Sequence, residues 1–329
     1  MNIGSVKLSN NLIMAPMAGI TDVPFRALAK EGGAGLVCTE MVSATALVYG
    51  DKKTRKIIEL SSGEHPVSVQ IFGSKPLHMA EAARISEDLG ADIVDINFGC
   101  PVRKIVKSGA GVKALENEKT AADIMEAVAN KIKVPATIKI RTGNTPEQNI
   151  APDMVKLAEK CGIKMVTVHA RPAAWGHTGK PNLSAVKEAV SVAGIPVVGN
   201  GGVTDEISAK EFIAQTGCSG LMIGRAAIGD PMLFNRIDHY LLHGDKLHGA
   251  TMEDRLTFLK RHAVLSCAHY GEKTGMIILR KVASYYLKGL PNASRIRDSF
   301  NKLTKLAELD PLLEGVWESP YFAQAVDFE

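Results

Sequence analysis

The 329-residue sequence contains no run of about 18 consecutive apolar residues, so we expect no membrane-spanning helix. Its N-terminus, MNIGSVKLSNNLIMAPM, lacks the basic flank and apolar core of a secretory signal, and we expect none. Its five cysteines stand singly, without CxxC or Cys/His spacing, which argues against a metal site. Dispersed cysteines are typical of reduced thiols, so we expect a cytoplasmic protein.

A strong excess of charge is also lacking. The net charge is +4, and the composition, 46% hydrophobic and 22% charged, is ordinary for a globular protein. The distribution of charge is more informative, because six Lys or Arg residues and a single acid, Asp298, occur between Arg280 and Lys302. Such a stretch is typical of a surface that contacts nucleic acid, although ordinary solvated helices can have it too.

Short apolar runs alternate with segments of helical composition over most of the chain. The runs expected to be strands are Leu12–Ala15, Gly35–Cys38, Val67–Ile71, Ile93–Ile96, Ala136–Ile140, Met165–Val168, Pro196–Gly199 and Gly220–Ile223. The helices expected between them are Val23–Glu31, Leu77–Leu89, Lys119–Lys131, Pro152–Cys161, Leu183–Ala193 and Asp205–Gln215. This alternation predicts an α/β protein with a (β/α)8 TIM barrel. An open doubly wound sheet is the alternative, although no GxGxxG follows the first strand.

Strand-like runs stop after residue 243, and the rest of the chain has helical composition. We expect helices over Met252–His269, Met276–Lys288 and Ala293–Leu309, with a turn in GLPNAS (289–294). The chain is therefore predicted to divide into a TIM-barrel catalytic domain, residues 1–243, and a small C-terminal helical domain, residues 244–329.

Polar side chains or glycines, together with Pro16, Met17 and Met41, stand at the carboxyl ends of the predicted strands, where the active sites of such barrels lie. Any one could be an ordinary capping or surface residue, but so many together predict a ligand site. They are Pro16, Met17, Glu40, Met41, Gln70, Asn97, Cys100, Lys139, Arg141, His169, Arg171, Asn200, Gly201, Gly202, Gly224 and Arg225.

Two features narrow the kind of ligand. In GNGG (199–202) and GRA (224–226), backbone amides and a guanidinium can bind a phosphate, although two tight turns would also explain the glycines. Lys139 ends an apolar strand and needs an anionic or electron-rich partner, and His169 ends the next strand. A phosphorylated cofactor is the simplest ligand that satisfies both features.

Several motifs, in their order along the chain, resemble the flavin-dependent tRNA-dihydrouridine synthases, most closely the bacterial B-type branch. They are MAPMAGITDVPFR, VQIFG, DINFGCPVRKIVKSGAG, IKIR, NGGV, IGRAA and YLKGLPNASRIR. NGGV and IGRAA alone are shared with other flavin barrels. The resemblance implies an oxidoreductase that binds FMN tightly, takes electrons from NADPH and reduces the C5=C6 bond of uridines in tRNA.

The resemblance also implies roles for individual residues. Cys100 would donate a proton to C5 of the uracil while reduced FMN supplies a hydride to C6. The residues implied in FMN binding are Pro16, Met17, Gln70, Lys139, His169, Asn200, Gly201, Gly202, Gly224 and Arg225. Those implied in RNA binding are Asn97, Lys139, Arg141 and Arg171 in the barrel, and Arg280, Lys281 and Lys288 in the helical domain.

A cysteine that works as an acid must stay protonated near neutral pH. The basic residues that follow Cys100, which are Arg103, Lys104 and Lys107, are therefore interpreted as contacts to RNA or backbone, and not as groups that lower the thiol pKa.

One segment departs from the family pattern HGRTRxQxYxGxADW, because this chain reads HARPAAWGHTGKPNL (169–183). The chain keeps His169, Arg171 and Gly179. It differs at Ala170, Pro172, Ala173, Trp175, His177 and Leu183. In the family this loop lies beside the substrate, so the change leaves open which uridine is modified and whether ribosomal RNA is the target.

Two other functions remain open from the sequence. A flavin barrel could reduce or oxidise a free pyrimidine, but a small substrate does not require a basic helical domain. A non-catalytic RNA-binding protein would not require Cys100, Lys139 and His169 together. We expect a monomer that binds tRNA and neither a metal nor a membrane.

Overall fold

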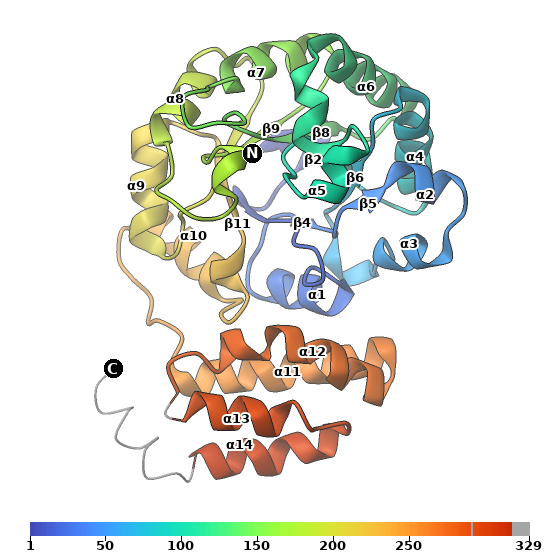
Figure 1. Cartoon of the computed structure of the whole chain (residues 1–329). Coiled ribbons are helices and arrows are strands. Elements are labelled where there is room, and N and C mark those ends of the chain that lie inside the picture. The colour runs from blue at the N-terminus through green and yellow to red at the C-terminus, as the bar shows by residue number, and fades with distance from the viewer. Residues whose placement is uncertain (291, 318–329) are drawn as a thin grey trace.

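A barrel of parallel strands packs on a layer of helices in the computed structural model, which describes residues 1–290 and 292–317 (Figure 1). Pro291 of the predicted turn and residues 318–329 of the predicted helical domain lie outside the described residues. None of the described helices combines the length and the apolar character that a membrane crossing requires.

Eight parallel strands form the barrel in the order β3, β11, β10, β9, β8, β7, β6, β4. A parallel bridge between Ile13 and Leu36 joins the first and last of these strands and closes the ring. This confirms the predicted TIM barrel, and the open sheet is wrong. The strands are β3 (Leu12–Met14), β4 (Val37–Cys38), β6 (Val67–Phe72), β7 (Ile93–Asn97), β8 (Ala136–Arg141), β9 (Val166–His169), β10 (Val197–Asn200) and β11 (Gly220–Ile223).

Helices surround the barrel where the sequence predicts them. Four of the six begin after a side chain that accepts a hydrogen bond from the first helical turn, as Asp22 does from the Phe25 amide (3.1 Å) and Asn182 from the Ala185 amide (3.1 Å). The predicted helices are α1 (Val23–Glu31), α4 (Pro76–Asp88), α6 (Glu118–Lys131), α7 (Ala151–Lys160), α8 (Leu183–Ser191) and α9 (Glu206–Thr216).

Several elements were not predicted, most of them because they are shorter than the windows in which periodicity is visible. They are the hairpin of β1 (Asn2–Ile3) and β2 (Val6–Lys7), β5 (Val42–Ser43), α2 (Ala44–Val48), α3 (Lys52–Ile57), α5 (Arg103–Lys107) and α10 (Leu233–His243). The hairpin closes the amino-terminal end of the barrel, since Ile3 is fully buried in a cluster with Ile93, Met165 and Val198.

Inward-facing side chains change character along the barrel axis. Near the amino-terminal end they are apolar, including Ile93, Met165 and Val198. Toward the carboxyl end they are polar and still buried, and this polar layer comprises Ser68, Gln70, Asp95, Asn97, Thr137, Thr167, His169 and Asn200. Because the period of a strand is two, inward positions alternate with core positions that face the helices. A polar layer at the carboxyl ends places the site at that end of the barrel.

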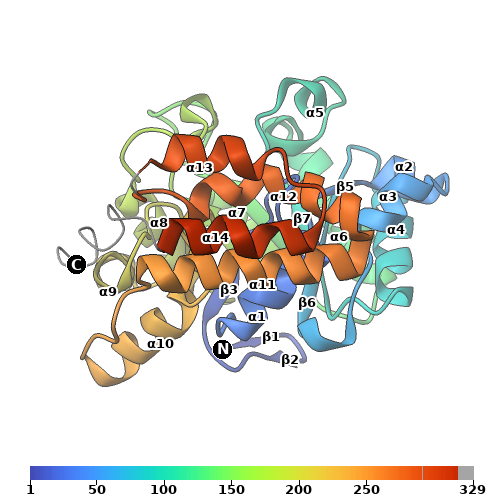
Figure 2. The same cartoon turned by 90° about the horizontal axis from the view of Figure 1, so that it is seen from below.

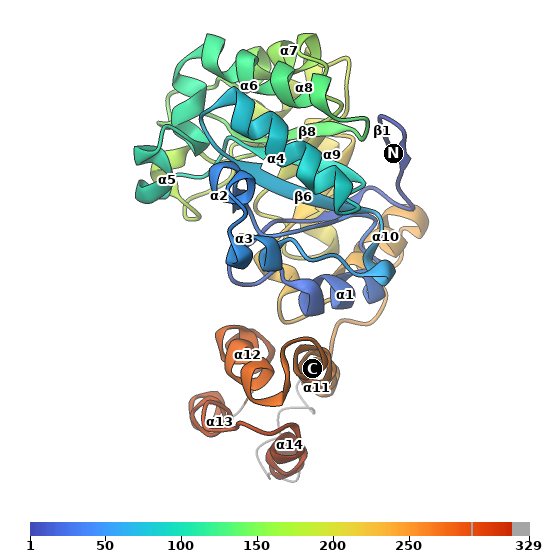
Figure 3. The same cartoon turned by 90° about the vertical axis from the view of Figure 1, so that its right-hand side faces the viewer.

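The C-terminal helices are α11 (Met252–Tyr270), α12 (Glu272–Tyr286), α13 (Ala293–Phe300) and α14 (Leu309–Trp317). Figure 2 shows α11 and α14 crossing beneath the barrel. In Figure 3, β1 lies at one end of the barrel and α5 at the other, and α12 and α13 lie toward the side of α5. The helices therefore extend toward the carboxyl end of the strands.

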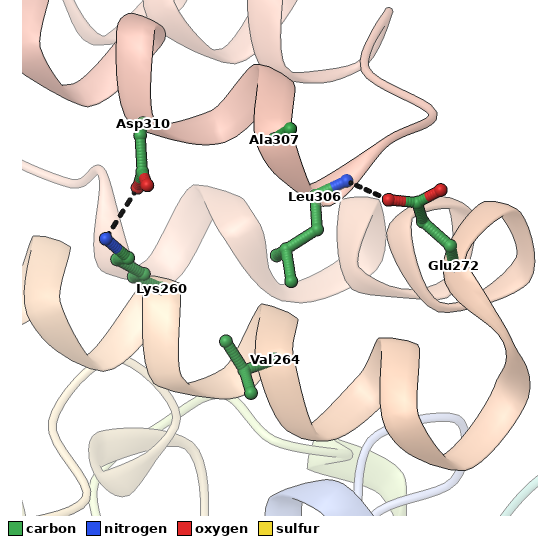
Figure 4. Close-up of a pocket in the computed structure, with 6 residues that line it drawn as sticks. All are labelled: Lys260, Val264, Glu272, Leu306, Ala307 and Asp310. Atoms are coloured by element: carbon green, nitrogen blue, oxygen red, sulfur yellow. Dashed lines mark hydrogen bonds and ion pairs between the residues drawn. The ribbon is translucent and has the colours of Figure 1, made fainter.

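The single helix predicted over Ala293–Leu309 is wrong, because the chain turns after Phe300. Side chains of α12 bind the backbone at the turn: Arg280 donates to the Leu303 carbonyl (3.0 Å), and Glu272 accepts from the Leu306 amide (3.0 Å). These bonds replace the helical ones that composition alone favours. The turn borders a hollow of about 370 Å³ between α11, α12 and α14 (Figure 4).

Both ends of α1 are bound by α11. At its beginning, the Tyr270 hydroxyl donates to Asp22 (3.0 Å), the same carboxylate that caps the helix. At its end, Arg261 forms an ion pair with Glu31 (2.6 Å). These contacts join the helical layer to the barrel beside the segment that follows β3.

Candidate active site

Strand register brings the predicted site residues together at the barrel mouth. Asn97 pairs with Lys139 across β7 and β8, and His169 pairs with Asn200 across β9 and β10. Gln70, one strand earlier on β6, accepts a hydrogen bond from the Asn97 amide group (2.9 Å). Residues far apart in the sequence thus form one continuous polar surface.

Cys100 is held in a tight turn after β7. The Asn97 side-chain oxygen accepts hydrogen bonds from the Gly99 amide (3.2 Å) and the Cys100 amide (2.9 Å). The returning chain passes so closely that a Cβ at Gly111, where φ is +62°, would lie 2.4 Å from the Cys100 carbonyl oxygen. Glycine is required there because no side chain fits this approach or favours this backbone conformation.

The environment of Cys100 favours a protonated thiol. The residue is 8% exposed and packs with Ile105 and Ala110. Burial raises the pKa of the thiol, and the opposing effects of a backbone hydrogen bond and of the nearby charges on Arg141 and Lys139 are smaller. The thiol can therefore serve as a proton donor near neutral pH.

Cations accumulate at the mouth without forming ion pairs in the described part of the chain, although the buried Asp95 acts electrostatically on Lys139. No carboxylate lies within ion-pair distance of Lys139, Arg141, Arg171 or Arg225 in residues 1–290 and 292–317. Burial and the charge of Arg141 lower the pKa of Lys139 to about 8, and burial lowers the pKa of Arg141 to about 10. Such a cluster is stabilised by an anionic ligand.

The divergent loop of residues 170–183 is fastened to the barrel by these arginines. Arg141 donates to the carbonyls of Gly99 (2.8 Å) and Gly176 (2.7 Å). Arg171 donates to the Gly179 carbonyl (2.9 Å), and Arg225 donates to the His177 carbonyl (3.1 Å). The sequence predicts that Arg141 contacts uracil. In the structure its Nε and Nη1 groups donate hydrogen bonds to backbone carbonyls on both sides of the mouth.

His169 lies under this loop in neutral form. Burial and the charges on Lys139 and Arg141 lower its pKa far below the ordinary value. Its ring stacks on His177 at 5.7 Å between centroids. A Cβ at Gly201, where φ is +102°, would lie 2.8 Å from the His169 ring, so the NGGV turn needs glycine at this position.

The basic residues of α12, and Lys288 just beyond its end, differ in where they point. Lys281 is exposed and its ammonium lies 3.7 Å from the position that a Cβ on Gly19 would occupy, at the loop after β3. Glu40 accepts a hydrogen bond from the Gly19 amide, next to Lys281. Arg280 is turned into the helical layer, where it binds the Leu303 carbonyl, and Lys288 is exposed.

The remaining predicted residues lie around the same mouth. Pro16 and Met17 belong to the loop after β3, whose Met17 amide is bound by the Thr21 hydroxyl (3.1 Å). Gly202 and Gly224 follow β10 and β11, and Asn200 donates to the Met222 carbonyl (2.7 Å).

Sequence reasoning missed Asp95 and His177. Asp95 is 3% exposed and accepts hydrogen bonds from Gln70 (2.7 Å) and Thr137 (2.6 Å). An acid two residues before Asn97 in a strand must share its inward face, and this spacing could have identified it. His177 stands in the divergent loop, where no pattern predicts its direction.

Comparison with known proteins identifies the family. The model of the family described as dihydrouridine synthase matches residues 13–319. This chain belongs to the dihydrouridine synthase family. The chain is 41% identical to tRNA-dihydrouridine synthase B of Pseudomonas aeruginosa, over 92% of this chain and 91% of that protein. It is 39% identical to tRNA-dihydrouridine synthase B of Escherichia coli (strain K12), over 97% and 99% of the two chains.

A solved structure confirms the fold class of this dihydrouridine synthase family member. Histamine dehydrogenase from Rhizobium sp. 4-9 superposes with a TM-score of 0.58 over 80% of this chain and 50% of that one. The two sequences are 13% identical, so the likeness concerns the fold alone.

The site of this dihydrouridine synthase fits a flavin phosphate ester. The Lys139 ammonium forms no ion pair within the described residues, and the buried Thr167 hydroxyl has no hydrogen-bond partner there. Both face the barrel interior beside the cation cluster. A planar ligand with polar edges and a phosphate would satisfy the unpaired donors and the positive charge together.

Proposed function

We propose that this protein is an FMN-dependent, NADPH-driven tRNA-dihydrouridine synthase that reduces the C5=C6 bond of uridines in tRNA. The observation that carries the proposal is the position of Cys100, a buried and protonated thiol at the mouth of a barrel that belongs to this family. Residues 1–243 would form the catalytic domain and residues 244–329 the RNA-binding domain of a cytoplasmic monomer.

We assign FMN binding to residues that the family resemblance implies and that lie around the barrel mouth. The cation cluster and the glycine turns after β10 and β11, with Arg225, would bind the phosphate. Lys139, Gln70, Asn200 and His169 would contact the polar edges of the ring system, with Pro16 and Met17 beside it. When bound and reduced, FMN supplies the hydride for C6 of the uracil.

Cys100 would protonate C5 from the face opposite the flavin. Asn97 and Lys139, paired across β7 and β8, would orient the uracil, while Asn97 also binds the Cys100 amide. Arg141 and Arg171 would act mainly by fixing the loop of residues 170–183 over the base. A uridine within a folded RNA must leave its stack to enter this site.

The proposal is tested by mapping dihydrouridine in RNA from cells with and without the gene. Loss of dihydrouridine from tRNA in the deletion strain, and its return with the plasmid-borne gene, supports the function. Loss of dihydrouridine from ribosomal RNA alone would mean that ribosomal RNA, and not tRNA, is the substrate. Flavin reoxidation by free uracil or orotate, with tRNA inactive, would instead indicate a pyrimidine oxidoreductase.

Lys281→Glu is expected to weaken tRNA binding, because its ammonium stands at the mouth where RNA phosphates would pass. The slope of log affinity against log salt concentration should fall by about one unit, with FMN content unchanged. Filter binding at several salt concentrations measures this.

The matched control is Lys7→Glu, which makes the same charge change at the opposite end of the barrel. An equal loss of affinity in both variants, or loss of FMN from Lys281→Glu, would contradict the assignment. Arg280 is less suited to this test, because its guanidinium also binds the Leu303 carbonyl.

Affinity of the apoprotein for FMN is expected to fall as the pH rises above about 8, the pKa of Lys139. The sign follows because the ammonium, which attracts an anion, predominates below this pKa and is lost above it. The limiting slope is about tenfold per pH unit. Fluorescence titration between pH 7.5 and 9.5 measures the trend, and a Lys139→Met variant with the same slope would refute it.

A further inference from the structure

A chain of hydrogen bonds runs inside the barrel from Asp95 to Cys100. Thr137 and Gln70 donate to the two Asp95 oxygens, at 2.6 and 2.7 Å. The Asn97 amide group donates to the Gln70 oxygen (2.9 Å), and the Cys100 amide donates to the Asn97 oxygen (2.9 Å). Asp95, Gln70 and Asn97 are 3%, 1% and 8% exposed, so solvent offers few substitutes.

The direction of every bond in this chain follows from its first member. A carboxylate only accepts hydrogen bonds, so Gln70 must turn its NH2 group toward Asp95 and its oxygen toward Asn97. Asn97 must then turn its NH2 group toward Gln70 and its oxygen toward the backbone amide of Cys100. Reversal at any link would leave a buried donor facing another donor, and a buried donor without an acceptor is destabilising.

We propose that Asp95 is a positioning residue that sets this direction and thereby holds the turn bearing the Cys100 thiol. The inference rests on the proposed role of Cys100 in uridine reduction. Burial raises the Asp95 pKa, and two donated hydrogen bonds and the positive charge of Lys139 oppose this effect only in part. The geometry is that of an acceptor, because Thr137 and Gln70 each donate to one of the two Asp95 oxygens. The acid thus acts on the reaction through Gln70 and Asn97, without touching the substrate.

Asp95→Asn keeps the shape of the side chain but converts one acceptor into a donor. Whichever way the new amide turns, one buried donor among Thr137, Gln70 and the Cys100 turn loses its acceptor. The double variant Asp95→Asn/Asn97→Asp restores a complete set with the direction reversed. The asparagine at 95 then donates to Gln70, Gln70 donates to the carboxylate at 97, and that carboxylate still accepts from the Cys100 amide.

Hydrogen exchange of the Gly99 and Cys100 amides, measured in the flavin-loaded protein, reports directly on the hydrogen bonds that hold the turn. We expect exchange about tenfold faster in Asp95→Asn and in Asn97→Asp, with protection returning in the double variant. Ser68→Ala is the control and should leave both amides unchanged, because it removes a buried interior hydroxyl that has no hydrogen-bond partner among the described residues. Unchanged exchange in Asp95→Asn, or additive loss in the double variant, would overturn the proposal.

Turnover provides the second measurement. In Asp95→Asn, kcat for uridine reduction in tRNA should fall on the order of 100-fold, with the tRNA KM and flavin content little changed. A raised KM with normal kcat would contradict a role through Cys100. If the protein reduces no uridine at all, the proposed function fails while the exchange results stand. If Asp95→Asn does not fold, the double variant Asp95→Asn/Asn97→Asp provides the test. The proposal requires that this variant folds and that its Gly99 and Cys100 amides are protected from exchange.

Discussion

Cys100→Ala is expected to slow uridine reduction by a factor on the order of 10²–10⁴, the usual contribution of a general acid. The thiol is buried among apolar side chains, and burial raises its pKa, so it can hold the proton that C5 receives. Flavin content and the rate of flavin reduction by NADPH should not change, because the thiol is not needed for either. Stopped-flow measurement of the two half-reactions separates these effects.

The control for this experiment is Cys161→Ala, which removes a buried thiol at the end of α7. It should leave both half-reactions unchanged. Cys100→Ser tests the acid itself, since a hydroxyl of similar size is a much weaker acid and should restore little activity. Normal uridine reduction by Cys100→Ala would show that Cys100 is a core thiol and not the proton donor.

Glu64→Ala is expected to lower the free energy of unfolding by about 3–5 kcal/mol, the second large effect. Glu64 and Arg26 are fully buried, and their side chains form two hydrogen bonds of 2.5 and 3.1 Å. Removal of the carboxylate leaves the guanidinium charge in the interior without a partner. Urea denaturation followed by circular dichroism, at fixed flavin saturation, measures the change.

A double change of Arg26→Met and Glu64→Met should cost less than Glu64→Ala, because no unpaired charge remains. The exposed pair of Arg84 and Glu81 provides the contrast, and Glu81→Ala should leave the denaturation midpoint in place. If Glu64→Ala were as stable as the parent protein, the buried pair would have no net effect on folding. Activity could fall as well, since Arg26 also binds the Thr21 carbonyl beside the site (2.8 Å).

The strands could be predicted because each is a short run rich in apolar and β-branched residues, and polar residues stand at the carboxyl ends of several of them. The polar ends in turn marked the site, since Asn97, Lys139 and His169 stand where parallel strands must bring them together. The resemblance to a family supplied the chemistry that periodicity does not contain. Both parts of the prediction depended on local patterns of a few residues.

What could not be predicted depends on contacts between distant segments. The break after Phe300 depends on Arg280 and Glu272, which bind the turning backbone from another helix. The bonding of Arg141 to carbonyls on two loops is equally non-local. Asp95 was overlooked because its importance lies in the order of donors and acceptors, which the sequence does not display.

The binding of both ends of α1 by α11 has a consequence for how such proteins can be recombined. Tyr270 contacts the residue that caps α1, and Arg261 contacts its last residue, so this interface is matched in detail. A C-terminal segment transplanted from a relative would have to bring its own partners for Asp22 and Glu31. Substrate choice in chimeric enzymes should therefore transfer only when α1 is exchanged together with the helices beneath it.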